Sequence, residues 1–173
     1  FLRAYETVPD DRESELVSNI LLNIGTTFQR MENWLLAREF TEKALMLAEE
    51  AGDKMAASGC LLALGRIAHA SEDRAGAESQ LLKALETAGE TKYEKTRVEA
   101  LLELGGLHAD SGSPEKALAR YNEALQVADR LGAKALIHQA YDKLSKAHEL
   151  IGDYKTSLDY YRRFARYERE VLS

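Results

Sequence analysis

A two-residue pattern, Leu-Gly or a close variant of it, returns along this chain at a constant interval of 40 residues. Its second residue stands at Gly25, Gly65, Gly105 and Ser145. Further small residues recur at fixed distances, at Ala37, Ala77, Ala117 and Ser157 and at Ala44, Ala84 and Ala124, with Phe164 in the last copy. Such a fixed period indicates a repeat protein, in which each unit packs on its neighbours. The small residues are expected where paired helices approach closely.

Each unit is predicted to form two antiparallel helices. Only 2 of the 173 residues are proline, and the chain is rich in Ala, Leu, Glu and Lys, which lose little side-chain freedom in a helix. In the second unit, Leu61, Leu64 and Ile67 follow helical spacing before a break of small and polar residues at 70–73. A second helix is predicted over 114–131 in the third unit. The expected fold class is therefore all-α.

Residues at the breaks predict how the helices end and begin. Gly52, Gly89 and Gly132 suit left-handed residues at helix ends, because glycine has no side chain to clash there. Asp53 is expected to cap the amide groups of the following helix. Ser113 is expected to do the same for a helix that starts with proline, a residue tolerated at the first helical position.

We expect a single domain over residues 1–173. The predicted units are 10–51, 52–89, 90–131 and 132–173, and residues 1–9 match the second helix of a preceding unit, since they align with Thr41 and its neighbours 40 positions later. The chain begins with Phe1 rather than Met, so we expect a fragment or a processed product. The last unit carries most of the departures from the pattern, as is typical of a terminal repeat.

These residues resemble the signature of the tetratricopeptide repeat family, in which Leu-Gly is followed by an aromatic residue, Ala, an aromatic residue, Ala and Pro. The first unit supplies Ile24, Gly25, Phe28, Ala37 and Ala44, and the third supplies Leu104, Gly105, Ala117, Tyr121, Ala124 and the turn residue Pro114. The resemblance implies a right-handed superhelical solenoid of helix pairs. A period of 40 is similar to that of members with extended repeats, which bind peptides or serve as sensory parts of bacterial signalling proteins.

The resemblance also implies that ligands bind in a concave groove lined by the first helix of each pair. Counted from the Leu-Gly marker, the groove residues are expected to be Asn19, Leu22, Asn23, Thr26, Gln29, Leu62, Arg66, His69, Glu99, Leu102, Glu103, Gly106, Gln139, Asp142, Lys143, Lys146 and Glu149. Asn23 and Arg66 resemble the residues with which extended members hold a peptide backbone or an acidic side chain. The alternative interpretation is a solvated polar face.

The last predicted helix is rich in aromatic residues and arginine. We interpret it as a capping helix whose arginines lie along an apolar surface with their charged ends in water. The alternative is a docking surface for a following domain or a second subunit, with Tyr160, Arg163 and Tyr167 as its candidate residues. A homo-oligomer is left open by the sequence.

Several classes of partner and chemistry are not expected. A net charge of −6 disfavours nucleic acid, and no apolar stretch approaches the roughly 20 residues that span a membrane. The single cysteine, Cys60, excludes an internal disulfide bond and is expected in the core, which fits a cytoplasmic protein. His148 and Glu149 look like the start of a zinc-protease motif, but Gly152 occupies the place of the second histidine. No metal, cofactor or catalytic residue is predicted.

The leading functional prediction is a scaffold that binds a protein or peptide. The alternative is a sensory or dimerising module of a larger bacterial signalling protein, for example a diguanylate cyclase. A small-ligand enzyme is less favoured, because it would need a deep apolar pocket with convergent polar groups.

Overall fold

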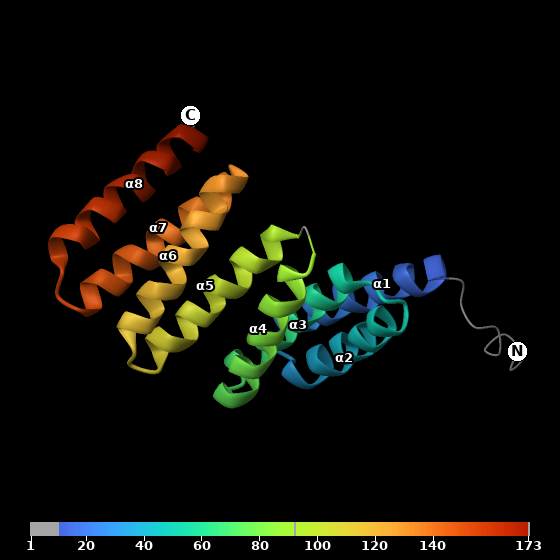
Figure 1. Ribbon diagram of the computed structural model, residues 1–173. Coiled ribbons are helices and arrows are strands. Elements are labelled where there is room, and N and C mark those ends of the chain that lie inside the picture. The colour runs from blue at the N-terminus through green and yellow to red at the C-terminus, as the bar shows by residue number, and fades with distance from the viewer. Residues whose placement is uncertain (1–10, 92, 173) are drawn as a thin grey trace, which may run out of the picture.

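The computed structural model describes residues 11–91 and 93–172, and this part of the chain consists of eight α-helices joined by short turns (Figure 1). The helices are α1 (Asp11–Arg30), α2 (Trp34–Glu50), α3 (Lys54–Ala70), α4 (Arg74–Gly89), α5 (Glu94–Asp110), α6 (Pro114–Leu131), α7 (Lys134–Leu150) and α8 (Tyr154–Leu172). The predicted all-α class is confirmed. The helix expected over residues 1–9 lies outside the described residues.

Consecutive helices pack as antiparallel hairpins, and the hairpins stack in a row (Figure 1). The hairpins are α1–α2, α3–α4, α5–α6 and α7–α8, and each second helix also contacts the first helix of the next pair. Every unit therefore buries its apolar face against its sequence neighbours, which is the defining property of a solenoid.

Aspartate and asparagine side chains start several of the helices. Asp53 Oδ1 accepts a hydrogen bond from the Ala56 amide at 3.0 Å, as predicted, and Asp73 Oδ1 accepts one from the Gly76 amide at 2.9 Å. These bonds satisfy backbone donors that have no partner within the helix. Ser113 does precede α6, but its side chain makes no capping hydrogen bond, so that prediction is wrong in its detail.

The glycines at the breaks divide into two groups. Gly52 and Gly132 adopt the predicted left-handed conformation, with φ of 67° and 61°. Gly89 does not: α4 ends on it and Glu90 continues in a right-handed conformation, with φ −78°. Four residues separate α4 from α5, one more than between α2 and α3.

The repeated small residues lie where the two helices of a hairpin come closest. Ala37, Ala77 and Ala117 are fully buried. A Cβ added at Gly65 would meet Leu81 Cδ2 at 2.6 Å, and one added at Gly105 would overlap the Tyr121 ring, so both glycines are required by the facing helix. Close packing at these positions sets the spacing of the hairpin.

In the last hairpin, α7–α8, different residues make the close contact between the two helices. Ser145 and Ser157 replace the glycine and the alanine, and Ser145 Oγ donates a hydrogen bond to the Ser157 carbonyl oxygen at 2.9 Å. The hydroxyl is buried but satisfied, so it carries no desolvation penalty from a missing partner. Phe164 replaces the second alanine, and its ring stacks on His138 with 4.1 Å between ring centroids.

Adjacent glycines in α5 allow a matched test of this packing. Gly105→Ala is expected to lower the free energy of unfolding by about 1–3 kcal/mol, because the new methyl group would overlap Tyr121, which is only 2% exposed. Gly106→Ala is the control: its nearest neighbour would be Tyr121 Oη at 3.9 Å, so alanine should stabilise the helix by about 0.5–1 kcal/mol. Denaturant unfolding measures the change in the free energy of unfolding for each variant. Equal changes of the same sign in the two variants would contradict the proposed close approach of the helices.

Candidate functional site

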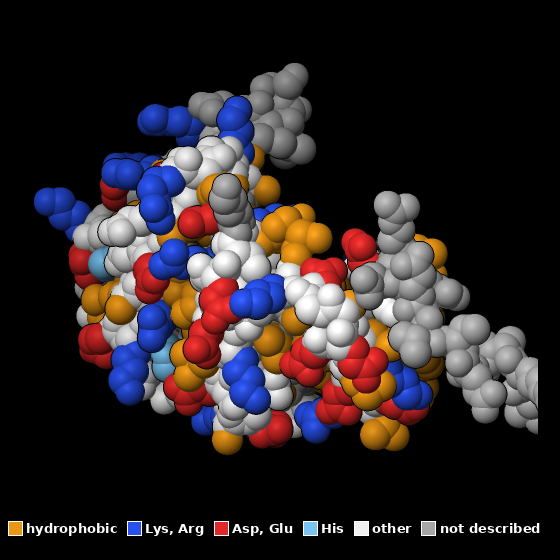
Figure 2. All heavy atoms as spheres, turned by 45° about the vertical axis from the view of Figure 1, so that its right-hand side comes forward, with side chains coloured by type: hydrophobic (Ala, Val, Ile, Leu, Met, Phe, Trp, Pro, Cys, Tyr) orange, Lys and Arg blue, Asp and Glu red, His pale blue; other side chains and the backbone are white. Residues whose placement is uncertain are grey.

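The first helices of the four hairpins form the inner face of the stack. Among the described helices, α1, α3, α5 and α7 contact one another in order, whereas α2, α4, α6 and α8 contact only first helices. A stack whose units approach on one side and separate on the other curves toward the closer side. Acidic and basic side chains are interspersed over much of the surface (Figure 2). The concave face is therefore built from the helices on which the groove residues were predicted.

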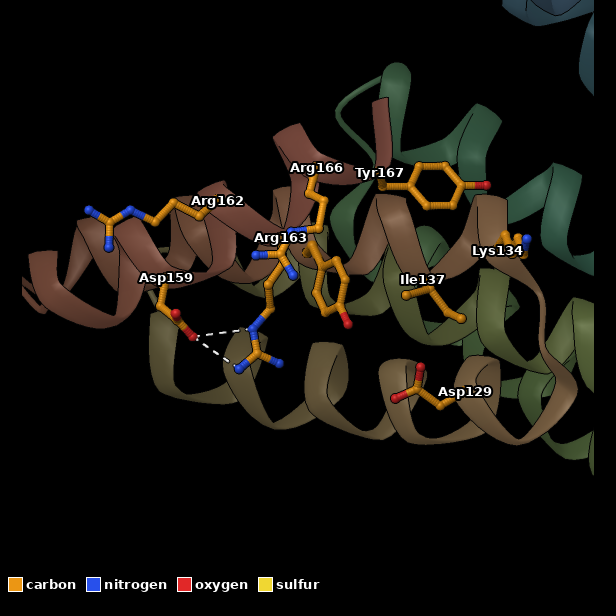
Figure 3. A pocket seen from close by; sticks show the side chains of 9 residues that line it. Asp129, Lys134, Ile137, Asp159, Arg162, Arg163, Arg166 and Tyr167 are labelled. Carbon is orange, nitrogen blue, oxygen red and sulfur yellow. Dashed lines mark hydrogen bonds and ion pairs between the residues drawn. The ribbon is translucent and has the colours of Figure 1, made fainter. Parts of the chain in front are cut away.

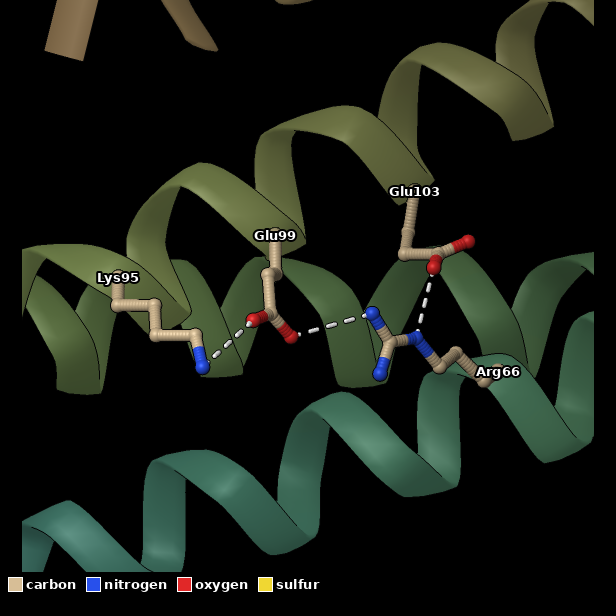
Figure 4. A network of polar contacts seen from close by, with 4 residues as sticks. All are labelled: Arg66, Lys95, Glu99 and Glu103. Atoms are coloured by element: carbon tan, nitrogen blue, oxygen red, sulfur yellow. Dashed lines mark hydrogen bonds and ion pairs between the residues drawn. The ribbon is translucent and has the colours of Figure 1, made fainter. Parts of the chain in front are cut away.

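Arg66, the predicted binder of a ligand carboxylate, is paired with two glutamates of the next repeat (Figure 4). Its Nε donates to Glu103 Oε1 at 2.6 Å, and its Nη2 donates to Glu99 Oε2 at 3.2 Å. Lys95 Nζ lies 3.8 Å from the second Glu99 oxygen. Arg66 therefore ties α3 to α5 through its Nε and Nη2 groups.

Two adjoining hollows open on the concave face. One, of about 390 Å³, lies between α5 and α7, and the other, of about 220 Å³, extends to His69 on α3. Glu103, Lys143 and Lys146 border both hollows, so the two form one groove. The expected groove residues that line it are His69, Leu102, Glu103, Gly106, Gln139, Asp142, Lys143 and Lys146.

The groove also contains residues that the repeat pattern did not single out as ligand contacts. Asp110 Oδ2 lies 3.0 Å from His69 Nε2, and it closes the α3 end of the groove. His138 and Phe164 border the larger hollow. Phe164 could have been found, because it replaces a small residue of the repeat. Asp110 gave no such signal, since it lies at the end of α5, outside the positions counted from Leu-Gly.

Nine of the expected groove residues border neither hollow: besides Leu22, Leu62, Arg66 and Glu99, these are the five described next. Asn19 and Asn23 are exposed on α1, and the Thr26 hydroxyl donates to the Leu22 carbonyl oxygen of its own helix at 2.9 Å. Gln29 is half-buried near the end of α1, and Glu149 is exposed near the end of α7. Their roles as ligand contacts stay predictions.

The three residues of the expected terminal docking surface lie on α8 and pack on α7. The guanidinium carbon of Arg163 lies 6.0 Å from the centroid of the Tyr141 ring and 5.7 Å from that of the Tyr160 ring. The Tyr167 and His138 rings also pack together, with 4.8 Å between their centroids. Arg163 Nη2 also pairs with Asp159 at 3.1 Å (Figure 3). Cation–π contacts and an ion pair together hold this arginine in place.

Metal-ligating side chains and a reactive cysteine would be the first candidates for catalytic chemistry in this chain. No group of three or more His, Cys, Asp or Glu side chains in the described part could hold a metal ion. Cys60 is fully buried, and burial raises the pKa of its thiol to about 12, with further contributions from Asp53 and Glu49. The same described helices include none long and apolar enough to cross a membrane.

The geometry defines a class of protein, a solenoid of paired helices with a concave groove. The family model for the tetratricopeptide repeat matches residues 16–90 and 96–165. The chain belongs to the tetratricopeptide repeat family, and its fold is the right-handed superhelical solenoid of that family, as the sequence predicted. No curated protein sequence matches it.

Solved structures of other repeat proteins are similar to this one. BtubC (BKLC) from P. vanneervenii has a TM-score of 0.83 at 21% identity, over 99% of this chain and 70% of its own. A signal transduction ATPase with a tetratricopeptide repeat sensor from Pyrococcus horikoshii has a TM-score of 0.77 at 23% identity, over 94% and 25%. The Rap conjugation gene regulator of plasmid pLS20, in complex with the Phr* peptide, has a TM-score of 0.74 at 18% identity, over 95% and 46%. This chain thus spans less than half of the last two proteins.

The burial of Cys60 predicts that its thiol is unreactive in the folded chain, and a thiol reagent can test this. Because the thiol has a pKa of about 12 in the folded chain and about 8.5 when unfolded, it should react at pH 8 only after denaturation. The folded state favours the protonated thiol, so this contribution to stability is complete below about pH 8.5 and is lost as the pH rises toward 12. Absorbance of released thionitrobenzoate with and without guanidinium measures the difference, and rapid stoichiometric reaction of the native chain would contradict it.

Proposed function

We propose that this chain is a non-catalytic scaffold that binds a peptide, or an extended segment of a protein, in the concave groove between α3, α5 and α7. The observation that carries the proposal is the groove itself, in which polar side chains from three successive first helices border two joined hollows. An extended segment that crosses the helices would meet donors and acceptors at each repeat.

The chemistry of the groove suits a peptide. The Gln139 amide both donates and accepts hydrogen bonds, as a peptide backbone requires. Lys143 and Lys146 present ammonium groups beside the carboxylates of Glu103 and Asp142, so the groove can pair with side chains of either sign.

The comparisons support the class of partner. One structural neighbour is a Rap regulator whose structure contains the Phr* peptide. Tetratricopeptide repeat proteins in general act as scaffolds without catalytic activity, and we extend that role to this chain. The role as a sensory module of a larger signalling protein stays a prediction, and the length and domain content of the native protein would test it.

Peptide selection tests the proposal directly. A library of random peptides is selected on the purified chain, and enriched peptides are measured by calorimetry. We expect Lys143→Glu with Lys146→Glu to change the affinity of those peptides by about tenfold or more, equivalent to about 1.4 kcal/mol, because both side chains border the groove.

The control variant carries the same charge change on the second helices, Lys83→Glu with Lys116→Glu, which are exposed on α4 and α6. It should bind the selected peptides as the parent does. Failure to enrich any peptide, or equal loss of affinity in both variants, would overturn the concave groove as the binding site.

A further inference from the structure

A second groove lies on the opposite side of the last two repeats, where α6 and α8 form the walls and α7 forms the floor. It encloses about 740 Å³ and is larger than either hollow of the concave face. Ile137 and Tyr141 of α7 line it. Arg162, Arg163 and Arg166 project from α8 (Figure 3). This groove takes no part in the proposed concave site.

The groove is cationic although the chain as a whole has a net charge of −6. Four cationic side chains line it, Lys134 and the three arginines, against the two carboxylates of Asp129 and Asp159. Asp159 is already paired with Arg163. Within the described part of the chain, Arg162 and Arg166 form no ion pair, and both are exposed. In the space-filling view, Lys and Arg side chains gather toward the C-terminal end (Figure 2).

The repeat register shows that this charge is particular to the last groove. One repeat earlier, Arg97 is neutralised by Glu123 at 3.3 Å. Forty residues on, the apolar Ile137 takes the place of Arg97, and Arg163 takes the place of Glu123.

A second position also changes from an acidic residue in the third repeat to a basic residue in the last one. Glu94, which lies 3.9 Å from Arg130 in the earlier repeat, corresponds to Lys134 in the last one. Two acidic positions have therefore become basic, and the arginine between the walls has been lost. Among the described residues, the last groove therefore carries more cationic than acidic side chains, although Arg163 itself is paired with Asp159.

The arrangement of the charges indicates the shape of the ligand. Arg162 and Lys134 lie toward opposite ends of the groove, with Arg163 and Arg166 between them (Figure 3). The groups follow the groove rather than converge on one point, as they would around a single phosphate. Arginine pairs with carboxylates in a bidentate manner, and the apolar floor can accept the carbon atoms of a polypeptide.

We propose that the groove between α6 and α8 binds an extended acidic peptide segment of a partner protein, at a site distinct from the concave groove. Carboxylates of the segment pair with Arg162, Arg166 and Lys134, while Arg163, held by Asp159 and two tyrosine rings, forms a fixed part of the wall. Binding of this kind weakens with salt, because its charges are solvent-exposed.

Fluorescence anisotropy with a labelled peptide of alternating Glu and Ser tests the proposal, at about 50 mM salt and up to about 1 mM protein. We expect saturable binding, and we expect Arg162→Gln with Arg166→Gln to weaken it by about tenfold or more. Both side chains are exposed, so the fold should be retained, and a thermal melt checks this. The same peptide with Gln in place of Glu should not bind.

The matched control replaces two exposed arginines elsewhere, Arg30→Gln with Arg74→Gln, and should leave the affinity unchanged. Equal weakening in the control would show attraction to net charge only and would overturn the proposal. So would no binding at all, or tighter binding of a single-stranded oligonucleotide of equal charge. If only the Lys143→Glu, Lys146→Glu variant loses binding of the acidic peptide, the peptide binds in the concave groove. That result would overturn this inference and leave the proposed function standing.

Discussion

The close approach of the two helices within each hairpin is the constraint on which the rest of the structure depends. A glycine in one helix faces Thr41, Leu81 or Tyr121 in the other, and fully buried alanines line the same contact. Because interiors are packed as tightly as organic crystals, a larger side chain there would force the helices apart. The period of 40 residues repeats this one contact, and stacking of the hairpins follows from it.

Stacking of the hairpins in turn produces two unlike surfaces. The first helices touch across repeats and are joined by ion pairs such as Arg66 with Glu99 and Glu103, which span α3 and α5. Neighbouring second helices, among those described, pack on first helices rather than on one another, and the outer groove lies between α6 and α8. The inner face therefore has charged side chains tied across repeats, whereas the charge of the outer groove depends on the residues of the last two repeats.

The sequence was sufficient for the fold because the fold is periodic. Small residues at a fixed interval predict the seam between helices, and their surroundings at Gly65 and Gly105 agree with that prediction. Local detail was less accessible: Gly89 and Ser113 have suitable residue types but do not make the expected turn and cap. Residue type alone does not decide such positions, because the connection at Ser113 has the same length as the one in which Asp53 caps its helix.

The candidate site was predicted less completely than the fold. The positions that line the concave groove on α5 and α7 follow from the repeat register, whereas the pairing of Arg66 with Glu103 was not predicted. That pair depends on how far one hairpin is rotated against the next, which no single repeat specifies. Arg163 and Tyr167, two residues of the expected terminal docking surface, line the outer groove between α6 and α8, but the contribution of Asp129 and Lys134 to it required the structure.

The absence of contact between neighbouring second helices, among the helices described, has a mechanical consequence. Each second helix is instead joined to the next hairpin through the first helix of that hairpin, as α6 is through α7. α7 is therefore shared by both grooves, because Ile137 and Tyr141 line the outer one and Gln139 and Lys143 line the concave one. A ligand that displaces α7 on one side would move part of the lining on the other side with it.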